Sequence, residues 1–390
     1  MPETMNAAKL TVALKAEATR LGFDLVGAAS AEPPPHLSLF RQWLAAGNAG
    51  AMHYLADRAE AYEHPRGVLP GVQSVLMLGM SYRRAEPREP GLGEGRVSRY
   101  AWGSDYHDVI HRRLRRLAEF HRRLVPDAAV RGVCDTAPIL ERDFAQQAGL
   151  GRVGKNTTLI HPTLGSWFFL AALLTSEPLD YDAAAEGSPC GDCRRCLDAC
   201  PTGALVAPYQ LDARRCLSYL SVELRAALPE EFREPLGDRL FGCDACQDAC
   251  PFNRKARSSG EASFEPRSGM NPVALAELFA LDDAAFRGRF RHTPLWRARR
   301  AGILRNAAIL LGNRPDPAAV AALVRGLNDA EPLVRGASAW ALGRYNSVEA
   351  RQAIQQRLKI ETDTRVQREI EAALDQWRTY EIRRRGRSSC

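Results

Sequence analysis

The sequence lacks any long uninterrupted hydrophobic segment. Its longest apolar run, WFFLAALL from Trp167 to Leu174, is far shorter than the roughly 20 residues that a helix needs to cross a bilayer. The chain starts with MPETMNAAKL, which contains no apolar secretory core and no cleavage site. We therefore expect a cytoplasmic protein with no membrane partner, whose cysteines bind metals rather than pair in disulfides.

Two common nucleotide-binding loops are also absent. No GxGxxG motif follows an expected strand, and the Gly-rich stretch GLGRVGKN precedes a strand instead of opening a helix. Neither a Rossmann dinucleotide site nor a Walker loop is therefore supported. The stretch is either a simple connector or a loop in which glycines let the backbone approach a large ligand beside Lys155 and Asn156.

Cysteine is plentiful by contrast, and eight of the ten cysteines lie between residues 190 and 251. The first run, CGDCRRCLDACP, has the bacterial ferredoxin spacing for iron-sulfur ligation. The second run, CDACQDACP, lacks the cysteine expected three residues earlier, where Leu240 stands. Cys216, in RRCLSYL between the runs, is the remaining nearby cysteine and the candidate for the missing ligand.

The spacing predicts two interlaced 4Fe-4S clusters. In two-cluster ferredoxins the cysteine before the proline ligates the other cluster, so each run contributes to both sites. We assign one cluster to Cys190, Cys193, Cys196 and Cys250, and the second to Cys200, Cys216, Cys243 and Cys246. A pair of structural zinc sites is the alternative, because CxxC pairs also bind zinc through four thiolates.

The length of 390 residues predicts two or three domains. Apolar periodicity predicts helices alternating with strands as far as Thr175, and a further helical segment at 271–290. The predicted fold class is α+β multidomain: a mixed α/β domain, a ferredoxin-like two-cluster domain and helical HEAT-like repeats. The predicted boundaries are 1–178, 179–265, 266–378 and a disordered basic tail at 379–390.

The C-terminal part combines repeats with positive charge. RNAAILLGN at Arg305, RGASAWALGR at Arg335 and RVQREIEAAL at Arg365 recur every 30 residues, which predicts stacked helix pairs. From Arg297 onward, 18 basic side chains face 10 acidic ones, so this part carries +8 of a chain whose net charge is +7. The partner is then a polyanion such as nucleic acid, or the charge forms a solvated helical face.

Few side chains outside the cysteine runs suggest chemistry. Asp135 follows an expected strand and precedes a turn, and a carboxyl group shielded there from water would have a raised pKa suited to proton donation. An exposed turn aspartate is the alternative. His107 and His161 are either candidate acids or ligands, or structural histidines. Cys134 is expected to be a small buried apolar side chain.

Long motifs resemble one family over nearly the whole chain. SRYAWGSDYHDVI, CDTAPILERDFAQQAGLGRVGKNTTLI and the two cysteine runs with RRCLSYL between them closely resemble epoxyqueuosine reductase. The resemblance implies an oxidoreductase that reduces the epoxide of epoxyqueuosine, at the wobble position of the tRNAs for aspartate, asparagine, histidine and tyrosine, to queuosine. It implies two 4Fe-4S clusters that pass electrons from an external single-electron donor to a base-off cobalamin. We expect a monomer.

The resemblance also implies roles for individual residues. Asp135 would be the proton donor, although Cys134 stands before it where a residue such as valine is expected. Cobalamin contacts would come from Arg58, Ser98, Asp135, Lys155, Asn156, Thr157 and Ser218. Arg305, Arg335 and Arg365 would hold the tRNA anticodon stem through its phosphates. A reductive dehalogenase, and an electron carrier or RNA-binding scaffold without enzymatic activity, are the alternatives from other classes.

Overall fold

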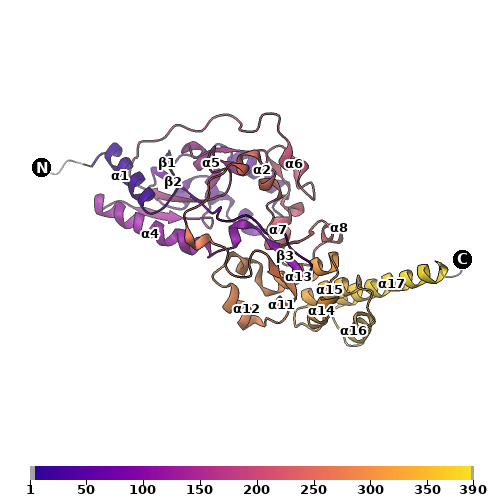
Figure 1. The fold of residues 1–390 in the computed structure, drawn as a ribbon. Coiled ribbons are helices and arrows are strands. Elements are labelled where there is room, and N and C mark those ends of the chain that lie inside the picture. Colours follow the sequence, from indigo (N-terminus) through magenta and orange to yellow (C-terminus); the bar gives the residue numbers. More distant parts are fainter. Residues whose placement is uncertain (1–4, 388–390) are drawn as a thin grey trace. The chain divides into compact units, whose positions relative to one another are not determined.

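The protein is represented by a computed structural model that describes residues 5–387, with side chains described as far as Trp377. The chain divides into two compact units, each assembled from three separate stretches (Figure 1). The first unit consists of Met1–Ala85, Gly103–Cys216 and Asp244–Glu265, and the second of Glu86–Trp102, Leu217–Cys243 and Pro266–Cys390. The domain boundaries expected from the sequence are continuous along the chain, and they stay a prediction.

A four-stranded sheet in the order β1-β2-β7-β4 forms the centre of the first unit, and all three of its pairings are antiparallel. This architecture confirms the expected mixture of helices and strands. The elements up to the last strand are α1 (Ala7–Arg20), β1 (Leu25–Ser30), α2 (Leu37–Ala45), α3 (His53–Ala56), η1 (Ala59–Tyr62), η2 (Pro65–Gly67), β2 (Ser74–Ser81), α4 (Tyr106–Leu124), β4 (Val130–Val133), α5 (Glu141–Gln147), β5 (Arg152–Val153), β6 (Leu159–Ile160) and β7 (Phe168–Thr175).

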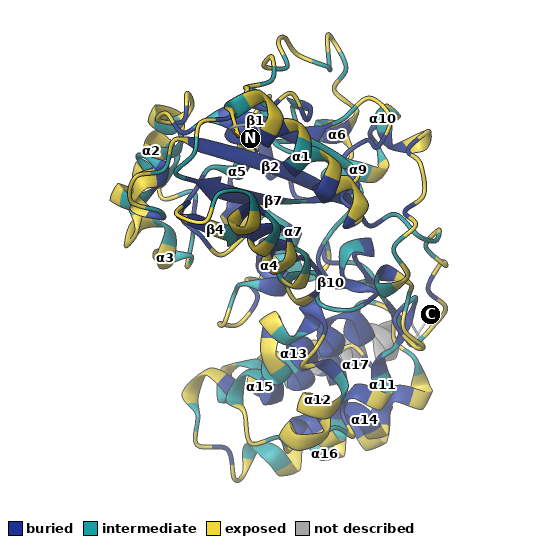
Figure 2. Cartoon of the chain, turned by 90° about the vertical axis from the view of Figure 1, so that its left-hand side faces the viewer, coloured by how far each residue is buried: buried dark blue, intermediate teal, exposed yellow. Residues whose placement is uncertain are grey.

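Helices cover both faces of this sheet, and β2 is buried at every residue (Figure 2). Because side chains alternate along a strand, Val75 and Met77 share one face, where they join a buried cluster with Phe144 of α5. Met80 lies on the other face, where its sulfur accepts a hydrogen bond from Arg113 of α4 at 2.9 Å. Helices α4 and α5 therefore pack on opposite faces of the same sheet.

Short elements carry the cysteine runs in the same unit. They are α6 (Arg195–Asp198), β8 (Leu205–Ala207), β9 (Gln210–Leu211), η4 (Ala213–Arg215), α9 (Ala245–Asp248), α10 (Pro251–Arg254) and η5 (Ala262–Phe264). The helices α6 and α9, one from each run, pack against each other. The two cysteine runs are therefore neighbours in the fold, although about 50 residues separate them in the chain.

The second unit joins a small sheet to helices. Its sheet has the order β10-β3-β11. Its elements before the repeats are β3 (Glu94–Val97), η3 (Arg99–Ala101), α7 (Leu217–Val222), α8 (Glu230–Arg233), β10 (Arg239–Phe241), β11 (Val273–Ala274), α11 (Leu275–Leu278), α12 (Asp283–Phe290) and η6 (Pro294–Ala298). The helix expected over 271–290 is therefore wrong in part, because the chain forms β11 first and then two shorter helices.

The repeats consist of helix pairs, as the sequence predicts. They are α13 (Arg299–Asn313), η7 (Pro317–Ala319), α14 (Val320–Leu327), α15 (Pro332–Leu342), α16 (Val348–Leu358) and α17 (Thr364–Arg387). Helix α15 packs between α13 and α17, while α14 packs against α15 and α16. Repeating arginines at 30-residue intervals thus fall on successive helices of one layer.

The predicted disordered tail is wrong over residues 379–387, because α17 continues to Arg387. The sequence of this stretch is rich in arginine, a residue type with high helix propensity. Residues 388–390 of the predicted tail lie outside the described residues. Over the part of the chain that the structure describes, no helix is both long and apolar enough to cross a membrane.

Candidate active site and cofactor-binding residues

Asp135 lies in a sharp turn directly after β4. Its backbone has a positive φ of 61°, a conformation that costs a non-glycine residue on the order of 1 kcal/mol. A hydrogen bond from the Thr136 N–H to the Cys134 carbonyl, 2.6 Å long, closes the turn. Cys134 is fully buried, as expected of a small apolar side chain. The Asp135 side chain lies outside this core, with 62% of its surface exposed, so Asp135 is the exposed turn aspartate and the expectation of a carboxyl group shielded from water is wrong.

Side chains from the start of α4 contact the Asp135 carboxylate. Tyr106 donates a hydrogen bond from Oη to Asp135 Oδ2 at 2.7 Å, and His107 Nε2 lies 3.4 Å from the same oxygen. Asp105 lies 2.8 Å from Nδ1 of His107. Burial alone would lower the pKa of His107, but the hydrogen bonds to Asp105 and Asp135 outweigh burial and raise the pKa to about 9. His107 is therefore protonated at neutral pH.

The backbone of this turn is held from two further directions. Glu141, the first residue of α5, accepts the Asp135 N–H at 2.8 Å, and Arg58 donates from Nη1 to the Thr136 carbonyl at 3.1 Å. Burial raises the pKa of Glu141 to about 8, and the nearby Asp135 carboxylate adds to the rise. Arg58, predicted to contact cobalamin, thus lies at the turn that carries the predicted acid.

The sequence alone does not single out Tyr106 or Glu141. Tyr106 is separated from Asp135 by 29 residues, and a tyrosine at the start of an amphipathic helix has no distinguishing pattern. The useful signal is positional, because both residues lie in the first turn of a helix that packs beside the sheet. Polar side chains at such helix starts are candidates for contacts with the residue that ends a neighbouring strand.

The turn between β5 and β6 contains three of the predicted cobalamin contacts, Lys155, Asn156 and Thr157. Lys155 donates its backbone N–H to Cys190 Sγ at 3.4 Å and its Nζ to the Gly191 carbonyl at 2.5 Å. Thr157 has a positive φ of 65°. Asn156 is buried, and its Nδ2 has no hydrogen-bond partner among the described residues. A buried donor without an acceptor costs about 1–3 kcal/mol, so a ligand oxygen would stabilise this loop.

The thiols of the first predicted cluster set lie close enough to perturb one another. Burial raises the pKa of Cys196, and the thiols of Cys190 and Cys250 add to the rise. Burial also raises the pKa of Cys250, with contributions from Cys190 and Cys193. Cys250, from the second run, and the cysteines of the first run therefore influence one another's pKa, and this ligand set stays a prediction.

In the second predicted set, Cys200 has an environment that favours a thiolate. Burial alone would raise the pKa of Cys200, but backbone N–H groups of the following turn outweigh burial and lower the pKa. One of these donors is Ala204 N, 3.2 Å from Sγ. Cys216, Cys243 and Cys246 are half-buried. Cys243 belongs to the second unit and the other three to the first, so this ligand set stays a prediction.

Three other predicted contacts lie in the second unit. Ser98 is buried just before η3, and Ser218 is half-buried within α7. Arg365 has a side chain that is 79% exposed and lies 2.7 Å from Asp363. The two serines stay predictions for cobalamin, and Arg365 stays a prediction for tRNA.

Two of the arginines predicted to hold phosphates are buried. Arg305 is 1% exposed, and its guanidinium donates to three backbone carbonyls in the segment 220–226 at 2.6–2.8 Å. Arg335 is 7% exposed and binds Glu361 through two hydrogen bonds of 2.8 and 2.9 Å. The prediction that Arg305 and Arg335 contact phosphates is wrong, because their N–H groups are used inside the fold.

Asn306, next to Arg305, makes similar structural contacts. It is fully buried, and its Nδ2 donates to the carbonyls of Ser221 and Leu240, both at 2.9 Å. Leu240, which stands where the ferredoxin spacing would place a cysteine, is itself fully buried in β10. The core therefore explains why an apolar residue occupies that position.

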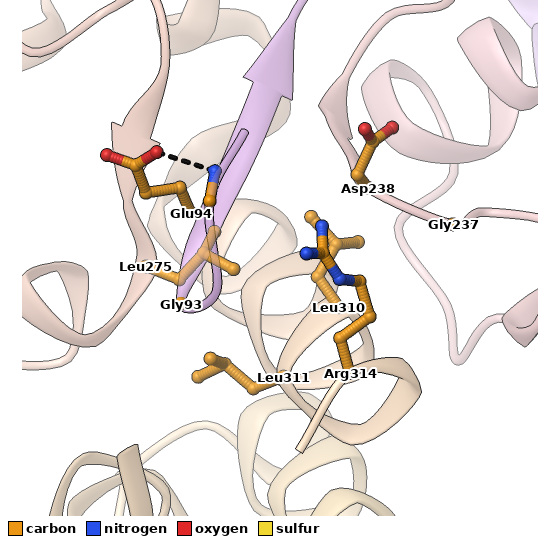
Figure 3. A pocket seen from close by; sticks show the side chains of 9 residues that line it. Gly93, Glu94, Gly237, Asp238, Leu275, Leu310, Leu311 and Arg314 are labelled. Atoms are coloured by element: carbon orange, nitrogen blue, oxygen red, sulfur yellow. Dashed lines mark hydrogen bonds between the residues drawn. The ribbon is translucent and has the colours of Figure 1, made fainter. Parts of the chain in front are cut away.

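A crevice in the second unit has polar groups that are already paired. Its walls include Glu94, Asp238 and Arg314 (Figure 3). Glu94 accepts the Gly91 N–H at 2.8 Å, and Arg314 donates to a backbone carbonyl at 3.4 Å. Asp238 lies 3.2 Å from an arginine of β3. The crevice is therefore a junction of β3, β10 and α13 and contains none of the predicted site residues.

Three protein families match parts of the chain. Residues 63–136 match a family described as epoxyqueuosine reductase QueG. Residues 189–253 match a 4Fe-4S double cluster binding domain, and residues 297–375 match HEAT repeats. The double-cluster match supports two 4Fe-4S clusters, and the HEAT match agrees with the helix pairs described above.

Relatives match over nearly their full length. Epoxyqueuosine reductase of Pseudomonas aeruginosa is 41% identical, covering 87% of this chain and 96% of its own, and that of Escherichia coli K12 is 35% identical, covering 96% and 99%. An epoxyqueuosine reductase structure with an epoxyqueuosine-modified tRNA-Tyr stem loop has a TM-score of 0.87 at 31% identity, covering 95% of this chain and 99% of that one. A Bacillus subtilis structure, with an aspartate catalytic loop swung out of the active site, has a TM-score of 0.87 at 30% identity, covering 95% and 100%. This chain belongs to the epoxyqueuosine reductase family of oxidoreductases.

Proposed function

We propose that this protein reduces the epoxide of epoxyqueuosine at the wobble position of tRNA to queuosine, with Asp135 as the proton donor. The observation that carries the proposal is the turn at Asp135, where the carboxylate accepts a hydrogen bond from Tyr106 and lies beside a protonated His107 that can supply its proton. The relative bound to a modified tRNA-Tyr stem loop supports an RNA substrate. We propose the tRNAs for aspartate, asparagine, histidine and tyrosine as substrates.

The reaction consumes two electrons and two protons. Both C–O bonds of the epoxide break, a carbon–carbon double bond forms, and the oxygen leaves as water. Asp135 supplies a proton to that oxygen as it gains negative charge. His107 Nε2, 3.4 Å from Asp135 Oδ2, holds the proton that passes through Asp135 to the substrate oxygen. Tyr106 keeps the carboxyl group oriented through its 2.7 Å hydrogen bond.

The cysteine runs fit two 4Fe-4S clusters. Thiolate sulfur is the ligand that such clusters take, and the spacing of eight cysteines predicts the interlaced assignment. The mutual pKa effects among Cys190, Cys193, Cys196 and Cys250 support the first set. We propose that an external single-electron donor reduces the clusters and that the protein acts as a monomer.

The β5–β6 turn fits a ligand rich in carbonyl oxygens, which agrees with cobalamin and its peripheral amide groups. The buried Nδ2 of Asn156 lacks an acceptor among the described residues, and Lys155 ties the same turn to the sulfur of Cys190. We propose that Arg58, Lys155, Asn156 and Thr157 contact the corrinoid. When bound, cobalamin and the clusters supply the two electrons of the reduction.

Replacing Asp135 by asparagine tests the proposal. Asp135→Asn keeps the shape of the side chain and an oxygen for the Tyr106 hydrogen bond, but it removes the transferable proton. We expect kcat on a modified stem-loop RNA to fall by about 10²- to 10⁴-fold, with unchanged iron content and corrinoid absorption. Asp127→Asn, at an exposed position between α4 and β4, is the matched control. Activity within threefold of wild type for Asp135→Asn would remove this residue from the mechanism.

A further inference from the structure

The stretch 287–300 of the second unit reads RGRFRHTPLWRARR, with six arginines and no carboxylate. It includes the end of α12, the whole of η6 and the start of α13. Arg287, Arg291 and Arg299 are exposed, and Trp296 is half-buried among them. The predicted tRNA contacts Arg305 and Arg335, further along the chain, are buried, so this stretch offers positive charge to solvent where those residues do not.

Two aromatic rings hold arginines of this stretch. The guanidinium groups of Arg287 and Arg299 lie over the Trp296 ring, 5.8 and 4.7 Å from its centroid. Arg289 lies over Phe290 at 5.1 Å. Stacking uses the flat face of a guanidinium and leaves the N–H groups at its edge available. The rings therefore restrict Arg287 and Arg299 without occupying their hydrogen-bond donors, whereas Arg289 also lies 4.0 Å from Glu277.

Other arginines of the unit are used differently. Arg297, in the same stretch, binds Glu223 through two hydrogen bonds of 2.8 Å, and Arg335 binds Glu361. By contrast, Arg287, Arg291 and Arg299 form no ion pair with any residue that the structure describes. The second unit thus separates arginines that stabilise the fold from arginines that remain available to a partner.

The start of α13 adds to the positive field. No side chain caps this helix, and its first turn contains no acidic residue. Its first residue is Arg299, whose φ is 61°. A helix N-terminus carries partial positive charge, so an arginine there is unfavourable until an anion binds. The arrangement is therefore better suited to holding an anion than to stabilising the isolated helix.

We propose that this basic-aromatic patch, defined as Arg287, Arg289, Arg291, Trp296 and Arg299, binds the sugar-phosphate backbone of the RNA substrate. The inference rests on the proposed function and names a surface for its RNA partner. Planar guanidinium edges match phosphate oxygens in a bidentate way. Closely spaced cations along one segment match the regular charge of a nucleic acid strand.

A triple variant tests the patch. Arg287→Ala, Arg291→Ala and Arg299→Ala together should raise the Kd for a synthetic anticodon stem-loop RNA by about tenfold or more. They should also reduce the magnitude of the slope of log K against log salt by about 2 to 3, since each lost phosphate contact lowers it by about 0.7–0.9. Arg325→Ala, at an exposed arginine of α14 outside the patch, is the control for each of the three single substitutions, since it also removes one positive charge.

A second variant tests the contribution of the Trp296 ring separately from that of the arginine charges. Trp296→Leu keeps every arginine but removes the ring under two of them, so it should weaken binding by a few fold and leave the salt slope nearly unchanged. Thermal unfolding should show that both variants remain folded.

The outcomes distinguish this inference from the proposed function. If wild type binds and reduces the modified stem loop while the triple variant matches Arg325→Ala in Kd and salt slope, the patch inference is overturned and the proposed function stands. If the triple variant keeps its RNA affinity but loses turnover only with an acidic redox protein, and not with dithionite, the patch binds that protein instead. If wild type neither binds nor reduces the stem loop, both proposals fail.

Discussion

Changing Asp105 should move the alkaline limit of activity, because Asp105 sets the charge of His107. The shift of the His107 pKa from 6.5 to about 9 corresponds to about 3 kcal/mol in favour of the cation. Asp105 is the nearer of its two carboxylate partners, at 2.8 Å against 3.4 Å for Asp135. Asp105→Asn should therefore lower the pKa of His107 by at least about one unit.

The size of the effect follows from titration. At pH 9 about half of the wild-type His107 is protonated, whereas a pKa near 8 in Asp105→Asn leaves about a tenth protonated. If His107 returns the proton to Asp135, the alkaline limb of kcat/KM should begin about one pH unit lower in the variant. The measurement is a pH profile on the modified stem-loop RNA, with Glu119→Gln on the exposed face of α4 as the control.

Stability gives a second, independent measurement of the same group. Because folding raises the pKa of His107, its stabilising contribution is fully present below about pH 6.5 and is lost as pH rises through about 9. The pH dependence of the free energy of unfolding should weaken over this window in Asp105→Asn. A variant profile that overlays wild type in activity would refute the role of His107 in proton return, even if the stability change is observed.

Two other predictions concern the fold and the clusters. The hydrogen bond from Arg335 outweighs burial and lowers the pKa of Glu361 to about 2, so Glu361→Gln should reduce the free energy of unfolding by about 3 kcal/mol at neutral pH. The stabilisation in wild type should disappear as pH falls from 4.5 toward 2. A loss below 1 kcal/mol in urea unfolding, with Glu371→Gln as control, would contradict this. Cys250→Ser should lower the iron content to about half, since it removes one cluster's ligand, whereas Cys134→Ala should keep full iron content; equal iron in both variants would refute the ligand assignment.

Much of the first unit could be read from the sequence, because its apolar patterns are long and unambiguous. The 3.6-residue period predicts a helix over 107–124, and the apolar runs predict strands over 74–82 and 166–175. These bounds lie within about two residues of those observed for α4, β2 and β7. Burial on both faces of β2 explains why its sequence is a continuous apolar run rather than an alternating one.

The roles of charged residues in the repeats could not be read in the same way. Arg305 recurs with Arg335 at a fixed interval, which resembles a surface pattern, yet Arg305 lies inside because its partners come from a segment about 80 residues earlier. Periodicity reports which face of a helix is apolar and says nothing about carbonyl groups that fold against it later. Burial of an arginine is therefore decided by tertiary acceptors that the local sequence does not contain.

The residues of the candidate site could likewise be predicted only in part from the sequence. Asp135 follows from its place after a strand, and the ferredoxin spacing identifies the cysteines. Tyr106 and Glu141 come from two helices on opposite faces of the sheet, so their meeting at Asp135 depends on the packing of the whole unit. The sequence could identify the acid but not the groups that orient it.

The contacts of Arg305 and Asn306 have a consequence for the order in which the protein matures. They satisfy backbone carbonyls of the segment that runs from Cys216 to Cys243, and both ends of that segment are assigned as cluster ligands. During synthesis the ribosome delivers all eight cluster cysteines before it delivers α13. Iron delivered to a nascent chain would then meet a segment whose carbonyls still lack these partners. Completion of the second cluster is therefore expected to wait for the repeats, so a fragment ending before α13 should not behave as a self-contained ferredoxin.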